Sequence, residues 1–406
     1  MSEYQAYYFA RAERPLSGSE LEAVEALSSH ITVNAHSAFV DYHYGDFKHN
    51  PQQVLEERFD VLVYYANWGA QIVAFRFDQA AVDLERLQRY GLDESLTVYT
   101  TDKDVIFWAE FNDDYGNGED YDLEYEGDAI VKLYRAVIQG DDRPLFLLWL
   151  AAMCDNGYDE DRMPIPAGLQ DLNSELKDLV DFIHIDQAQI AVAAQQNNAP
   201  AAKHVSARKI NYAQYLDQLS QDQKTHYLKQ LLTGDPHIVR ADLIKELHPH
   251  IPKPKTASKT DSEPALTFLE LENLAEKWRE LKRQEHEAQR VAERRAYFER
   301  LEAEVQKLWQ KARKLIELKQ PKTYEQATEI LYALKCLAIE KNDLAAYTTR
   351  VEKLTTAYPR LSSLRPRLEA AGLLTFDESE KGVRFGNSQS SWQEAHPADW
   401  LFNFNY

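Results

Sequence analysis

The chain is poor in cysteine and lacks the cysteine spacings that mark a redox or zinc site. Its 406 residues include two cysteines, Cys154 and Cys336, which stand far apart in apolar stretches of helical pattern. Neither has a second cysteine at CxxC spacing, so the sequence predicts no disulfide framework and no paired-cysteine metal site. We expect a reducing, cytoplasmic setting.

Long apolar runs are also missing. The longest is LFLLWLAAMC at 145–154, well short of the ~20 residues that a helix needs to cross a bilayer. The first residues, MSEYQAYYF, contain no basic segment followed by an apolar core, so we expect no signal peptide. Both absences favour the same cytoplasmic location.

The common reaction signatures are absent as well. The sequence contains no GxxxxGK[ST], GxGxxG, GxSxG or HExxH pattern. Their absence does not exclude catalysis, but it lowers the expectation of an enzyme. No cofactor is predicted.

Charge is abundant and unevenly placed. The chain has 66 acidic and 46 basic side chains, a formal net charge of −20. Residues 1–200 carry 37 acidic and 13 basic side chains (−24), whereas 201–406 carry 29 and 33 (+4). An acidic first half repels nucleic acid and anionic membranes, so only the second half is expected to approach a polyanion.

Short strand and helix patterns alternate in the first part of the chain. Apolar or alternating runs predict strands, and helices are expected between them and before Gly91. The runs LTVYTT and DVIFWAEF predict a hairpin that turns at Asp102 and Lys103. We therefore predict an α+β domain over 1–126 with a mostly antiparallel sheet. The other expected strands are 4–11, 31–44, 61–66 and 71–77, and the expected helices are 19–29 and 51–59.

Helical periodicity dominates from Asp128 onward. Asp128 is expected to cap a helix that ends at Gly140, and Pro144 to lie in the first turn of the helix LFLLWLAAM. We predict a helical domain over 127–248, followed by a linker at 249–264. Its further helices are expected at 174–194, 212–232 and 238–247.

Residues 266–318 contain no proline or glycine and predict one helix, roughly 75–80 Å long at about 1.5 Å per residue. Apolar residues at coiled-coil spacing mark its two ends, and polar residues fill its middle, so we expect a solvated rod with packed ends. A helical hairpin turning near Asn342 should follow. The third domain is thus 265–372, and 373–406 is a polar tail with late aromatic residues.

The acidic stretch 111–128 resembles a calcium loop. Asp113, Asn117 and Glu124 fall on positions 1, 5 and 12 of such a loop, but Tyr115 stands where a short carboxylate or amide is needed. A strand, rather than a helix, is expected to lead into it. We favour a solvated acidic loop over a calcium or magnesium site.

A second cluster of polar residues is VDYHYGDFKHNP. His43, Asp46 and His49 have a spacing of three, which on a helix could form a metal face. Gly45 and the aromatic neighbours instead indicate a strand that runs into a turn, where Asp46 could close an Asx-turn. A ligand role for His43 and Asp46 stays open.

Several stretches resemble a family of bacterial cytoplasmic proteins whose activity is not established. They are HYGDFKHNP, YYANWGA, GDDRPLFLLWL, PIPAGLQDLNSELKDLVDFIHID, KTYEQATEILYALKCLA and LSSLRPRLEAAGL, and the likeness runs nearly end to end. Genes of this family often stand beside those of SWIM zinc-finger proteins, which implies a shared complex. The matching positions include Asp46, Trp68 and Arg143, whereas His49 departs from the family pattern.

Three functions are compatible with these patterns. The first is a non-enzymatic protein–protein interaction or scaffold component of a bacterial cytoplasmic complex. The second is an enzyme or small-ligand sensor with a pocket between the N-terminal sheet and the 144–153 helix, lined by Asp46, Trp68 and Arg143. The third is a nucleic-acid-associated accessory protein that uses the basic residues of helix 277–314, although acidic residues interleave with them.

Overall fold

The computed structural model describes residues 3–92, 95–112, 123–156, 161–200, 212–234, 236–247, 250, 264–358 and 363–374. The chain forms two compact units, Met1–Leu281 and Lys282–Tyr406. The first unit has two clusters of buried side chains, one on each face of a sheet, and the second unit has its own cluster.

The sheet of the first unit has seven strands in the part of the chain described, in the order β2-β3-β1-β4-β5-β7-β6. Every neighbouring pair is antiparallel. The fold class is therefore α+β, as the sequence predicts. The strands are β1 Tyr4–Ala10, β2 Ile31–Val33, β3 Ser37–His43, β4 Val61–Ala66, β5 Ala70–Asp78, β6 Leu96–Thr100 and β7 Asp104–Asn112.

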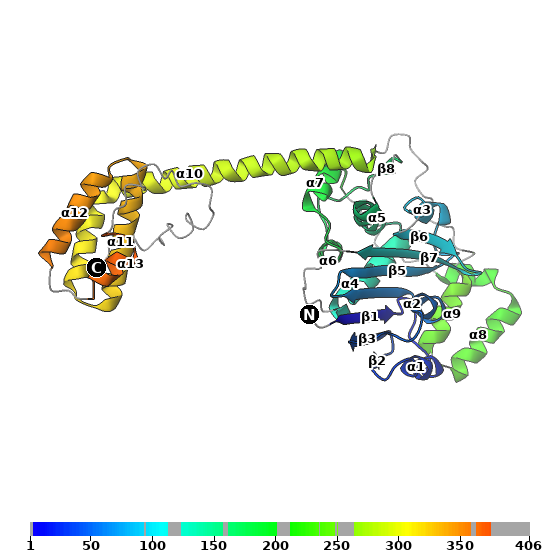
Figure 1. Ribbon diagram of the computed structural model, residues 1–406. Helices are drawn as coiled ribbons and strands as arrows, with labels where there is room; N and C mark the ends of the chain where they lie inside the picture. Colours follow the sequence, from blue (N-terminus) through cyan, green and yellow to red (C-terminus); the bar gives the residue numbers. More distant parts are fainter. Residues whose placement is uncertain are drawn as a thin grey trace. The chain divides into compact units, whose positions relative to one another are not determined.

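Helices cover both faces of this sheet (Figure 1). The alternation of side chains along β1 shows how: Tyr8 points into the cluster shared with α4 to α7, whereas Tyr7 and Phe9 belong to the cluster with α1 and α2. The central strands are thus buried on both faces, which explains their nearly continuous apolar runs. The helices are α1 Gly18–Glu25, α2 Pro51–Arg58, α3 Leu84–Gln88, α4 Leu123–Ile138, α5 Arg143–Asn156, α6 Ser174–Phe182 and α7 Gln187–Gln196.

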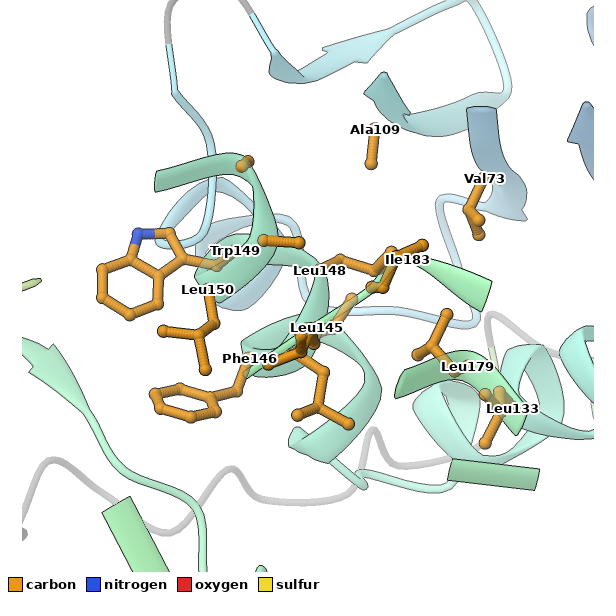
Figure 2. Packing of buried hydrophobic residues seen from close by; sticks show 14 of the residues in the cluster. Val73, Ala109, Leu133, Leu145, Phe146, Leu148, Trp149, Leu150, Leu179 and Ile183 are labelled. Carbon is orange, nitrogen blue, oxygen red and sulfur yellow. The ribbon is translucent and has the colours of Figure 1, made fainter. Parts of the chain in front are cut away.

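The centre of the larger cluster is α5. Its residues 145–150 are each at most 2% exposed, and a helix that is apolar all round must be enclosed on every side. Figure 2 shows Leu145 and Leu148 beside Leu179 and Ile183 of the α6 segment, with Val73 and Ala109 of the sheet nearby. The boundary expected at 126/127 therefore lies inside one core.

The start of α4 differs from the prediction. The helix begins at Leu123, so Asp128 is not its N-cap but lies inside it, where its Oδ1 accepts a hydrogen bond of 2.8 Å from the hydroxyl of Tyr8. Gly127 packs on the ring of the same tyrosine. The helix extends into the acidic stretch because Glu124 and Glu126 are favourable in a first turn.

Two other predicted helices are divided. The expected helix 174–194 breaks at His184, whose φ of 53° is incompatible with a continuous α-helix and separates α6 from α7. The expected helix 212–232 consists of a 3-10 helix, η1 Tyr212–Gln218, and α8 Gln221–Thr233, which a capping box at Ser220 starts afresh. Helix α9, Pro236–Leu247, follows.

The long helix is confirmed as α10, Phe268–Glu317. Its first turns pack on the core of the first unit through Leu271 and Ala275, and a short pair of strands, β8 Met163–Pro164 and β9 Ala265–Leu266, precedes it. Leu281 continues the coiled-coil spacing of Leu271, Leu274 and Trp278, and from that spacing we expected it to be packed, but it is 53% exposed. Among the described helices, none has both the length and the apolarity required to cross a bilayer.

The second unit is helical. The last turns of α10 pack with α11 Pro321–Glu340, α12 Leu344–Ala357 and α13 Arg365–Ala370 around one cluster. The predicted hairpin turns at Asn342, whose φ is 55°. Tyr347 fixes its two helices by donating a hydrogen bond of 2.9 Å to the carbonyl oxygen of Leu331. Most of the linker predicted at 249–264 (residues 249 and 251–263) and of the tail predicted at 373–406 (residues 375–406) lies outside the described residues.

We predict that Gly127→Ala destabilises the first unit. A methyl group at this position would lie 2.1 Å from Cδ1 of Tyr8, a ring that is 4% exposed and held by Asp128. Alanine is more favourable than glycine inside a helix by about 1 kcal/mol. Moving the Tyr8 ring away from the new methyl group should cost more than this gain. We therefore expect the free energy of unfolding to fall by about 1–3 kcal/mol. Urea unfolding measures it.

The matched control is Gly18→Ala in α1, where an added methyl group meets no atom within 4 Å. This variant should be as stable as the original chain or slightly more so. Equal stability of both variants would show that Tyr8 does not pack on Gly127 as described.

Candidate functional site

A charged cleft of about 680 Å³ lies at one end of the central strands. Arg11 follows β1, Asp60 precedes β4, Asp78 ends β5 and Asp104 begins β7, and antiparallel pairing brings these four ends together. Helix α9 supplies another wall with Arg240, Asp242 and Lys245. In Figure 1, α8 and α9 are drawn beyond the ends of β1 and β5.

The floor of the cleft is a buried ionic network centred on Asp60, which is 6% exposed. Its Oδ1 accepts a hydrogen bond of 2.7 Å from Arg76 Nη2, and its Oδ2 accepts one of 2.9 Å from the backbone of Ala12. Arg76 also donates to the carbonyl oxygen of Phe59 and lies 3.5 Å from Asp104. The carboxylate of Asp60 is paired with a positive charge, and the guanidinium group of Arg76 donates to several acceptors, so this network can remain buried.

Glu20 connects α1 to the cleft. Its carboxylate receives two hydrogen bonds from Arg14, closes a capping box with Ser17, and lies 3.2 Å from Arg11 Nη2. The hydrogen bonds from Arg14 are the main reason that the pKa of Glu20 falls to about 2. This network holds the loop after β1 against α1.

The wall formed by α9 is attached by two longer ion pairs. Arg14 Nε lies 3.9 Å from Asp242, and Lys245 lies 3.7 Å from Asp78. Asp242 and Lys245 are about half exposed, at 45% and 54% of the side chain, so solvent screens both pairs. The ion pairs of the two walls therefore differ: those around Asp60 and Glu20 are short and largely buried, and those of α9 are longer and about half exposed.

Two charged side chains that line the cleft have no ion-pair partner among the described residues. Twelve described lining residues are acidic or basic, and ten of them take part in ion pairs of 4.0 Å or less; the exceptions are Glu13 and Arg240. Desolvation raises the pKa of the Glu13 carboxyl, the charge of Asp60 raises it further, and Arg135 opposes the rise. Glu13 is still reached by solvent, because it faces the open cleft.

A second cleft of about 460 Å³ adjoins the first. Arg11 and His36 line both, and the second continues between Tyr8, α4 and the start of α6. The Arg11 side chain is 9% exposed, and its Nε has no hydrogen-bond acceptor among the residues described. Arg11 thus stands at the junction of the two clefts with one donor unused.

Three of the candidates chosen from the sequence lie at the opposite end of the sheet. His43 ends β3 and its ring lies 4.9 Å from that of Tyr4, at the start of β1. Asp46 is exposed and accepts a hydrogen bond of 2.9 Å from Gln5. Trp68, 50% exposed, occupies the turn between β4 and β5. None of these side chains lines the charged cleft.

Arg143 is buried and has a structural role. It is 5% exposed, and its guanidinium group donates to both carboxylate oxygens of Asp141 and, at 3.4 Å, to the carbonyl oxygen of Gly168. These bonds fasten the turn between α4 and α5. Asp46, Trp68 and Arg143 therefore do not surround one pocket, and the space between the sheet and α5 is filled by side chains.

The candidate metal ligands are not brought together in the part of the chain described. Asp113 and Asn117 lie outside the described residues, and Glu124 is exposed on α4. No three His, Cys, Asp or Glu side chains among the described residues, which include His43, Asp46 and His49, are arranged to hold a metal ion.

Comparisons with protein-family profiles, curated proteins and solved structures give no match to the chain. The likeness to a bacterial family encoded near SWIM zinc-finger proteins therefore stays an expectation, and a functional assignment depends on the residues of the two units.

The residues of the charged cleft were not predicted as a site from the sequence. Arg11, Asp60, Asp78 and Asp104 each stand at the end of an apolar strand, or one residue beyond it. Charged residues at the ends of several strands could indicate a site of this kind. The prediction requires the order of the strands in the sheet, because only neighbouring strand ends meet. Glu13 and Arg240 gave no signal, because they are separated by more than two hundred residues.

We predict that Glu20→Gln lowers the free energy of unfolding by about 1–3 kcal/mol at pH 7, because the charged hydrogen bonds to Arg14 are lost. Folding lowers the pKa of Glu20 from 4.5 to about 2, so folding favours its ionised form. The stabilisation is complete above pH 4.5 and is lost as the pH falls toward 2. The two proteins should therefore converge in stability below pH 4.5.

Urea unfolding at pH 7, 4.5 and 3 measures this difference. Glu22→Gln, at an exposed position of the same helix, is the control and should change stability little at any pH. A difference between Glu20→Gln and the original chain that is the same at all three pH values would contradict the role assigned to Glu20.

Proposed function

We propose that this chain is a non-enzymatic interaction component of a bacterial cytoplasmic protein complex. The observation that carries the proposal is a row of exposed leucines on α8. Leu228, Leu231 and Leu232 are 63%, 41% and 86% exposed, and their spacing of three and four residues places them on one side of the helix. Contiguous exposed apolar side chains of this kind are typical of protein-binding surfaces.

The packing of α8 supports this role. The helix buries none of its own residues. Its polar contacts are with α9, where Tyr227 donates to the carbonyl oxygen of Asp242 and Gln223 to the carboxylate of Glu246, and with η1, where Lys224 lies 3.7 Å from Asp217. An amphipathic helix in water normally covers its apolar side, and none of the described residues covers this side of α8.

The partner that fits is a protein with an apolar groove bordered by basic residues. Residues 1–200 carry a charge of −24, and such a field accelerates association with a basic partner and disfavours an acidic one. The resemblance of the sequence implies one specific partner to test, a SWIM zinc-finger protein encoded nearby.

Two alternative functions have unequal support. The second candidate is the binding of a small ligand, and the charged cleft favours it. This cleft lies at a different place from the pocket that we expected beside α5. The nucleic-acid role through α10 has little support, because many of its basic residues are paired with glutamates. Examples are Lys282 with Glu285, Arg290 with Glu287, Arg294 with Glu340, Arg295 with Glu299 and Lys307 with Glu304.

We predict that the double substitution Leu228→Ser, Leu232→Ser lowers partner recovery at least tenfold when the tagged full-length chain is purified from its native host. Recovery is measured by quantitative mass spectrometry. Because both leucines are exposed, the free energy of unfolding should change by less than about 0.5 kcal/mol. Loss of partner recovery would then come from the surface and not from unfolding.

Leu281→Ser is the matched control, because Leu281 is a 53% exposed leucine on α10. Unlike the leucines of α8, it has no other exposed large apolar side chain three or four residues away. It should leave partner recovery unchanged. A chain recovered alone and monomeric, or equal recovery by all three proteins, would count against the proposed function.

A further inference from the structure

We propose that the charged cleft at the ends of β1, β4 and β5 binds a small zwitterion of the amino-acid type, with its ammonium group at Glu13 and its carboxylate group at Arg240. This inference does not depend on the proposed function, because the cleft and the leucines of α8 are different surfaces.

The first argument is the charge inventory of the cleft. Each of its other described acidic and basic side chains lies within 4.0 Å of an opposite charge, whereas one acid, Glu13, and one base, Arg240, do not. Burial raises the pKa of Tyr212 most, Glu13 raises it further and Arg240 lowers it, so both charges lie within electrostatic reach of the same hydroxyl group. They are nevertheless not in contact with each other, since no ion pair joins them. A ligand with two opposite charges can occupy the space between them.

The second argument is that a ligand with one charge fits less well. A lone cation would satisfy Glu13 but would leave Arg240 unpaired and repel it, and a lone anion would do the reverse at Glu13. A metal ion is disfavoured, because the described residues hold no group of three suitable ligands. Only a ligand carrying both signs pairs both side chains.

The third argument concerns size. A volume of about 680 Å³ falls within the roughly 300–1,000 Å³ typical of small-ligand sites. Glu13 and Arg240 both line this one cleft, so a molecule as small as an amino acid can occupy it beside both side chains.

Calorimetric titration of the full-length chain tests the proposal. The probes are L-alanine, L-leucine, L-phenylalanine, L-glutamate, L-lysine and L-arginine. For each amino acid that binds, the amine without its carboxylate and the acid without its ammonium group are titrated as well; for alanine these are ethylamine and propionate. At least one amino acid should bind with a Kd below about 1 mM, and both of its single-charge analogues at least tenfold more weakly.

The variants Glu13→Gln and Arg240→Gln should each weaken binding of that amino acid at least tenfold. Neither side chain makes an ion pair in the described structure, so both variants should fold with an unchanged melting temperature. The matched controls Glu22→Gln and Arg89→Gln remove exposed charges outside the cleft and should leave the Kd unchanged.

The direction in which each of the two substitutions changes the affinity distinguishes a zwitterion from a simple cation or anion. If Glu13→Gln weakens binding while Arg240→Gln strengthens it, the ligand is a simple cation and the proposal fails. The opposite pair of signs would identify a simple anion, with the same consequence. Absence of binding by all six amino acids, or equal weakening by the control variants, would also overturn it.

Discussion

The carboxylate of Asp60 is the interaction on which the first unit depends. It joins the loop after β1, the start of β4 and the end of β5 through the backbone of Ala12 and the guanidinium group of Arg76. A buried carboxylate is tolerated only when its charge is paired and its lone pairs are used, and both conditions are met here. The same bonds fix where the strands end, so they also create the cleft.

The local features of the fold follow from the sequence. The run VLVYYA predicts β4 because an uninterrupted apolar strand of this length must be covered on both faces, and β4 occupies those residues, Val61–Ala66. The long helix was predictable because nothing between 268 and 317 interrupts it. The break at His184 was not, since a non-glycine residue with positive φ is set by tertiary packing and leaves no mark in the periodicity.

The site could be predicted much less well than the fold. Polar motifs in the sequence predicted Asp46 and Arg143 as site residues. Asp46 is an exposed residue, and the guanidinium group of Arg143 is hydrogen-bonded to Asp141. The unpaired charges Glu13 and Arg240 belong to segments that meet only in three dimensions. Recognising them requires knowing which other charges are already neutralised, and that information is contained in distances rather than in residue types.

The two outermost strands are short, and this limits how another protein can bind to the edges of the sheet. The sheet ends in β2, which has three residues, on one side and in β6, which has five, on the other. Such short edges offer few free backbone donors and acceptors to an added strand, so β-augmentation and edge-to-edge aggregation are both disfavoured. A partner of the first unit must instead recognise side chains, and its specificity is then set by helix surfaces that can change in sequence without disturbing the sheet.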